Sequence, residues 1–92
     1  MKLLVYMKDG RTCYLLERRH RLAQLVRDEP YHEGESVTTV KGHWNPHTGE
    51  YVWQSVPVRW IAKGSIAVVE EVRGLDDAVA MLRDEPVESA VG

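Results

Sequence analysis

Two short apolar segments flank a tight-turn sequence at the start of the chain, and this pattern constrains the fold more than any other. Residues 3–7 and 12–16 are β-prone, and Asp9-Gly10 between them is typical of a type I′ two-residue hairpin turn. The register that follows pairs Met7 with Thr12, Tyr6 with Cys13, Val5 with Tyr14 and Leu4 with Leu15. Both faces are then largely apolar, whereas a hairpin with water on one side alternates apolar and polar residues. We therefore expect this hairpin to lie centrally, covered on both faces or curled within a small barrel.

A second hairpin is predicted from residues 36–44 and 51–56, which flank the turn-forming segment NPHTGE. Its register places Trp44 opposite Tyr51, Gly42 opposite Trp53 and Val40 opposite Ser55 on one face. A glycine opposite a tryptophan lets the indole lie across bare backbone, so we expect this aromatic face to point inward. The other face is mixed and carries Thr39, Lys41, His43, Val52, Gln54 and Val56.

A third ribbon is predicted after Pro57, which cannot donate to a β-ladder and indicates an edge or a bend. Residues 58–62 and 65–72 would form it around a turn near Lys63-Gly64. The letters RDEP end two apolar helical segments, at residues 27–30 and 83–86. A duplicated ββα unit would explain this repeated sequence, and so would a common way of ending helices.

Helical spacing occurs in two places. From Glu17 to about Asp28, Leu22, Leu25 and Val26 fall on one side, and Pro30 stops the helix. From Leu75 to Leu82, Leu75, Ala78, Val79 and Leu82 form one stripe, and Pro86 ends it. The predicted fold class is therefore α+β, a curled antiparallel sheet of five to six strands, open or closed into a small barrel, with two short helices.

Composition indicates one soluble domain. The chain has 92 residues, of which 43% are hydrophobic and 28% charged, and no apolar run approaches the roughly 20 residues that span a bilayer. We expect a single compact domain over residues 1–86 and a frayed tail over 87–92. The single cysteine, Cys13, excludes an intrachain disulfide and suits a reducing compartment, so we expect a cytoplasmic protein.

The clearest candidate binding site is a cluster of positive residues where the first helix begins. Arg18, Arg19, His20 and Arg21 lie at a helix start, which already carries partial positive charge, and no Ser, Thr, Asp or Asn precedes them as an N-cap. An anionic partner would turn each unfavourable contact into a favourable one. The alternative is that Glu17 and the acids of residues 28–35 neutralise the cluster, or that it is solvated.

Aromatic residues form a second candidate. Trp53 and Trp60 could stack bases while Arg59 contacts a nucleic-acid backbone, with Trp44, Tyr51 and Lys41 contributing. The alternative is core packing, because the chain has no Phe and its Trp and Tyr residues supply the aromatic burial. The net charge of −2 argues against a surface that is basic throughout.

Catalysis and metal binding are not indicated by any motif. Cys13 and the histidines match no recognised ligand spacing, and no phosphate loop or nucleophile motif is present. We predict no catalytic residues, no metal and no cofactor, although a close Cys13–His43 pair in a cleft would favour an enzyme.

The leading interpretation is a small non-catalytic binding or regulatory module that contacts an acidic protein partner through the arginine cluster. A module that binds nucleic-acid phosphates with its arginines and bases with its tryptophans is the alternative. A membrane partner is not expected. Short hairpins leave sheet edges exposed, so homodimerisation through an edge or the aromatic face is a further expectation.

Overall fold

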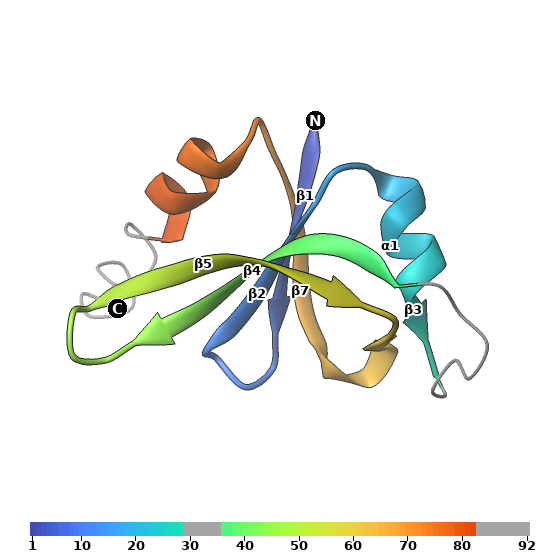
Figure 1. Ribbon diagram of the computed structural model, residues 1–92, viewed down its shortest axis with the longest axis horizontal. Helices are drawn as coiled ribbons and strands as arrows, with labels where there is room; N and C mark the ends of the chain where they lie inside the picture. The colour runs from blue at the N-terminus through green and yellow to red at the C-terminus, as the bar shows by residue number, and fades with distance from the viewer. Residues whose placement is uncertain (29–35, 83–92) are drawn as a thin grey trace.

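A five-stranded antiparallel sheet dominates the computed structural model, which describes residues 1–28 and 36–82 (Figure 1). The strands lie in the order β5-β4-β2-β1-β7. Their bounds are β1 (Lys2–Met7), β2 (Thr12–Leu16), β4 (Val37–Asn45), β5 (Glu50–Val58) and β7 (Ile66–Val72). The mixed α and β character and the antiparallel sheet are confirmed. The sheet does not close into a barrel, because β5 and β7 remain at its two ends.

Shorter elements connect these strands and cover them. Helix α1 (Arg19–Leu25) follows β2, and a two-residue strand β3 (Val26–Arg27) follows it directly. Strand β6 (Ile61–Ala62) pairs with β3 in parallel, and a 3₁₀ turn η1 (Lys63–Ser65) leads into β7. Residues 75–82 are also helical, and they lie on the other side of the crossing strands from α1 in Figure 1.

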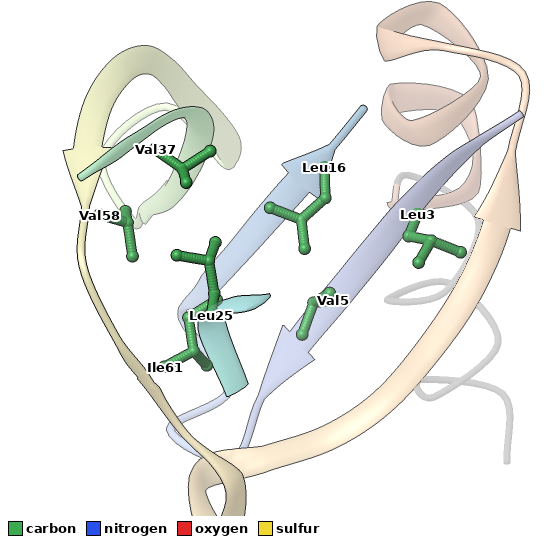
Figure 2. Close-up of a cluster of buried hydrophobic side chains, with 7 residues drawn as sticks. All are labelled: Leu3, Val5, Leu16, Leu25, Val37, Val58 and Ile61. Carbon is green, nitrogen blue, oxygen red and sulfur yellow. The ribbon is translucent and has the colours of Figure 1, made fainter. Parts of the chain in front are cut away.

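The β1–β2 hairpin lies inside the sheet with the predicted register, Leu4 opposite Leu15 and Tyr6 opposite Cys13. Both of its faces are buried, as its double apolar pattern predicted. One face packs under α1, β3 and β6, in a cluster formed by Leu3, Val5, Leu16, Leu25, Val37, Val58 and Ile61 (Figure 2). The opposite face packs against helical residues 75–82, in a cluster formed by Leu4, Cys13, Leu15, Val72, Ala78 and Leu82. We call these the α1 face and the C-terminal face.

The turn of this hairpin differs from the prediction, although the register does not. A type I′ turn needs positive φ at both central residues, and among the described residues only Gly10 and Gly49 have positive φ. The Gly10 N–H donates to the Met7 carbonyl at 3.2 Å, so the turn spans Met7–Gly10 with Gly10 after the bend at φ 70°. The Asp9 carboxylate fixes this loop by accepting the N–H groups of Arg11 and Thr12, each at 2.8 Å.

The β4–β5 hairpin also has the predicted register, with Gly42 opposite Trp53 and Trp44 opposite Tyr51. A Cβ at Gly42 would lie 2.8 Å from Cys13 Sγ and 2.9 Å from Trp53 Cζ3, so the two side chains meet over bare backbone. Trp53 and Tyr51 pack on the C-terminal face, which confirms the inward orientation of the aromatic side. Pro57 lies in β5 at the edge of the sheet, as its missing N–H requires.

One predicted boundary and one predicted element are wrong. The first helix ends at Leu25 rather than near Asp28, because Val26–Arg27 is extended and pairs with Ile61–Ala62. The third ribbon does not form, since Ile66–Val72 pairs with β1 instead of with residues 58–62. A backbone bond from the Lys8 N–H to the Ser65 carbonyl, at 2.8 Å, aligns β7 beside β1. Because this ribbon is absent, the described residues do not form the second ββα unit that a duplication would require.

Several expectations stay untested by this arrangement. Over residues 1–28 and 36–82, no helix is both long and apolar enough to cross a lipid bilayer. The cytoplasmic location stays a prediction. The domain limit at residue 86, the tail 87–92 and the helix stops at Pro30 and Pro86 fall outside the described residues.

Candidate anion-binding pocket between α1 and β4

The junction between β2 and α1 places the arginine cluster at the surface. Arg18 is the N-cap residue of α1, with an extended backbone (φ −153°, ψ 160°), and its side chain makes no capping hydrogen bond. The first turn of α1 contains no acidic residue. The predicted unfavourable interaction is therefore present, because cations occupy the positive end of the helix dipole, where backbone N–H groups lack partners.

The three arginines of the cluster have different environments. Arg19 donates from Nη2 to Glu71 Oε1 on β7, so an ion pair within the fold neutralises its charge. Arg21 donates from Nη1 to the Gln24 amide oxygen at 3.3 Å, which leaves its charge unneutralised. Arg18 makes no side-chain ion pair with any described residue. His20 lies in the first turn of α1.

A pocket of about 560 Å³ opens beside Arg18 and Arg21. We call it the arginine pocket, and its lining comprises Leu16, Glu17, Arg18, Arg21, Ser36, Val37, Thr38 and Thr39. The segment from Leu16 to Arg21 and the start of β4 thus contribute its two walls. Arg18 and Arg21 are three positions apart, a spacing that brings helical side chains to one side. Because α1 has only seven residues, the pocket and not the helix end defines the candidate site.

Thr39 gives independent support to a polar ligand in this pocket. The residue is only 4% exposed, and its Oγ1 finds no hydrogen-bond partner among the described residues. Leaving a buried hydroxyl unsatisfied costs about 1–3 kcal/mol, so such groups usually have a functional or structural reason. A ligand oxygen in the arginine pocket would supply the missing partner.

The acids that were expected to neutralise the cluster are only partly engaged with it. Glu17 lines the arginine pocket, but its Oε1 lies 3.4 Å from Lys2 Nζ, so its charge is shared with another cation. Asp28 makes no ion pair with a described residue. Glu29, Glu33 and Glu35 fall outside the described residues, so neutralisation by that loop stays an alternative.

The second predicted site is not assembled as one patch. Trp53 packs on the C-terminal face against Gly42, with its ring centroid 6.0 Å from that of Tyr51. Trp60 lies at the opposite face, where its Nε1–H donates to the Arg27 carbonyl of β3 at 3.1 Å. Arg59 is exposed and lines a hollow with Trp60 but not with Trp53. Trp53 therefore serves the core, and only Arg59 and Trp60 share a surface.

The Cys13–His43 pair that would favour an enzyme is not formed. Cys13 is fully buried on the C-terminal face, and its Sγ lies 3.8 Å from the Gly42 carbonyl. His43 pairs with Thr12 one position along, which directs it to the other face. Burial raises the pKa of the Cys13 thiol to about 12, so the nucleophilic thiolate is strongly disfavoured.

Sequence reasoning found Arg18 and Arg21 but missed Ser36, Thr38 and Thr39. A signal for Thr39 was present, since strand alternation puts it on the same face as Val37 and Lys41. That face was interpreted as mixed, and its contact with the start of α1 could not be seen without the tertiary fold.

The fold and the pocket define a class only in general terms, a small α+β domain with a concave basic pocket. No family model, no curated protein and no solved structure matches the chain. The geometry and charge of the pocket are therefore what indicates its function.

Proposed function

We propose that this protein is a binding module that takes an acidic segment of a protein partner into the arginine pocket. The supporting observation is the meeting of Arg18 and Arg21 with the buried hydroxyl of Thr39, which has no hydrogen-bond partner among the described residues. A carboxylate accepts hydrogen bonds from guanidinium and hydroxyl groups at the same time. One acidic side chain can thus satisfy the orphan hydroxyl and neutralise positive charge.

Several features favour a protein partner over nucleic acid. The net charge of the chain is −2, which provides no general attraction for a polyanion. The two tryptophans expected to stack bases lie on opposite faces of the sheet. The part of the chain that the structure describes has no Trp or Tyr among its exposed large hydrophobic residues. Base stacking needs an open ring face, so the local arginine pocket is better suited to a carboxylate.

The test compares two variants that remove charge at neighbouring positions. The probe is a fluorescein-labelled peptide of alternating Glu and Ser, read by anisotropy, with Gln in place of Glu as the uncharged control. Arg18→Gln with Arg21→Gln should weaken binding by at least about tenfold, because each lost charge-assisted bond contributes more than 1 kcal/mol. Arg19→Gln should change binding by less than about twofold, because that arginine pairs with Glu71 outside the pocket.

Three results would contradict the proposal. The first is an Arg19 variant that weakens binding as much as the pocket pair does, which would indicate a diffuse charge effect. The second is a pocket pair with no effect on binding. The third is a pocket pair that lowers the urea midpoint markedly, which would show that Arg18 and Arg21 are paired inside the molecule, with Glu29, Glu33 or Glu35 as the acids to test next.

A further inference from the structure

Two more hollows lie on the same face of the sheet as the arginine pocket. One, of about 390 Å³, is lined by Tyr14, Lys41, Val56, Pro57, Val58, Arg59 and Trp60. The other, of about 480 Å³, is lined by Lys41, His43, Trp44, Asn45, Pro46, Val52, Gln54 and Val56. We call them the Trp60 hollow and the hairpin hollow. They share Lys41 and Val56, so they adjoin each other.

Strand β4 forms a common floor for all three depressions. Its alternate residues Val37, Thr39, Lys41 and His43 point to one face, and they line in turn the arginine pocket, the Trp60 hollow and the hairpin hollow. Neighbouring same-face residues on a strand are separated by about 6.6–6.8 Å. Lys41 is the next same-face residue after Thr39, so the hairpin hollow follows the arginine pocket along β4, although the two share no lining residue. The Trp60 hollow lies beside this line, toward Val56 and Val58 of β5. We call the three depressions together the β4 groove.

The β4 groove is predominantly positive. Its described lining includes the basic residues Arg18, Arg21, Lys41 and Arg59, and its only acid is Glu17. Glu17 is within 3.4 Å of Lys2, so little negative charge is left to offset the row. The Lys41 ammonium lies 6.0 Å from the centroid of the Tyr14 ring and makes no ion pair with a described carboxylate.

Apolar surface lies between these charges. Val52 is 45% exposed in the hairpin hollow, and Val56 and Trp60 are half-buried in the Trp60 hollow. The Trp60 indole N–H is already bonded to the Arg27 carbonyl, so the ring is held in place as a fixed wall. A ligand that combines carboxylates with short spacer side chains matches such a surface better than a row of planar bases does.

We infer that the β4 groove binds an extended acidic segment of a protein partner whose acidic residues occur at alternate positions. An extended peptide repeats its same-side residues every 6.6–6.8 Å or so, which is also the spacing of the groove floor. One carboxylate enters the arginine pocket, and the next approaches Lys41 in the Trp60 hollow. This inference rests on the proposed function, because it requires the arginine pocket to bind a carboxylate.

The experiment compares two labelled peptides of equal length and composition. In one, Glu and Ser alternate; in the other, all Glu residues form one block. Parent protein should bind the alternating peptide at least about fivefold more tightly, a difference well within the worth of one additional ion contact in a groove. Lys41→Gln should reduce that preference to less than about twofold. Lys41→Arg should preserve it, and so should Lys63→Gln, which removes the same charge from η1 outside the groove.

The outcomes separate this inference from the proposed function. Equal affinity for the two peptides, or an unchanged preference in Lys41→Gln, would overturn the groove even if the Arg18 and Arg21 variant weakens both peptides. Failure of parent protein to bind either peptide would overturn the proposed function as well. Tighter binding of oligo-dT of matched charge, with quenching of tryptophan emission, would replace the acidic segment by single-stranded nucleic acid.

Discussion

Gly42 is the residue on which the packing of the C-terminal face most visibly depends. Cys13 Sγ and the Trp53 ring both approach the place where a Cβ would lie, at 2.8 and 2.9 Å. Real Cβ contacts are never this short, and Cys13 is fully buried, so the neighbours have little room to move.

Gly42→Ala should therefore lower the free energy of unfolding by about 1–3 kcal/mol, the usual cost of overpacking a core. Urea unfolding followed by tryptophan fluorescence measures it. Gly64→Ala is the matched control, because nothing lies within 4 Å of a Cβ there and φ is not positive. Because Gly→Ala by itself stabilises through the unfolded chain, Gly64→Ala should be neutral or slightly stabilising, and a loss there equal to that at Gly42 would show that the close contact is not the cause.

Ionisation of the Cys13 thiol should lower the free energy of unfolding at alkaline pH. Burial raises the pKa of this thiol from 9.0 to about 12 in the folded state. Between these values the unfolded chain has lost the proton that the folded chain keeps, so the unfolded state binds fewer protons and stability decreases as pH rises, by at most about 1.4 kcal/mol per pH unit. Cys13→Ala should be less stable overall but should show a flatter dependence above about pH 9. Identical slopes in both proteins would contradict the assignment.

At the scale of elements, local patterns predicted the two hairpins well because their partners are adjacent in sequence. The double apolar face of β1 and β2 and the Gly42–Trp53 pairing each required only a short loop and strand alternation. The end of α1 and the position of β7 depend instead on Ile61–Ala62 and on β1, which are distant in sequence. Val26 and Ile66 are β-prone, but the neighbouring sequence does not determine which strand each of them pairs with.

Helix α1 gives a prediction in which stability and binding change in opposite directions. Arg18 has the extended backbone of an N-cap but no side chain suited to capping, so Arg18→Ser should add the missing bond to an N–H of the first turn. We expect the free energy of unfolding to rise by about 0.5–2 kcal/mol. Affinity for the alternating acidic peptide should fall at the same time.

The control for this prediction is Arg19→Ser, one position into the helix. It breaks the pair with Glu71 and cannot cap, so stability should stay level or fall slightly. If Arg18→Ser were less stable than the parent, Arg18 would have a structural role within the fold.

At the scale of the whole molecule, β5 and β7 are the two edge strands of the five-stranded sheet, and no other described strand pairs with them on the outside. The aromatic face is occupied by residues 75–82, so the expected homodimer is confined to an edge. Strand β7 is the better candidate, because Val68 and Val69 are 48% and 39% exposed, whereas β5 contains Pro57.

We expect concentration-dependent dimers in sedimentation velocity, and we expect Val69→Lys to return the protein to monomers, since a charge on an edge strand opposes pairing. Parent protein that is monomeric at every accessible concentration would contradict the predicted homodimer.

The candidate site shows the same limit as the fold. The sequence identified the arginines through their poor fit to a helix start, which is a local conflict. It could not bring Thr39 to Arg18 and Arg21, because the path of the chain from α1 to β4 depends on packing across the sheet. The sequence left Trp53 a candidate both for the core and for base stacking, and its packing with residues 75–82, a long-range contact, favours the core.

The most direct test of the account is an amide chemical-shift titration of the intact protein with the alternating acidic peptide. We predict that the amides of Arg18 to Arg21 and of Ser36 to Thr39 shift first and saturate together, because the carboxylate enters between α1 and β4. Shifts confined to Tyr51, Trp53 and residues 75–82, on the C-terminal face, would contradict the claim that the arginine pocket is the binding site.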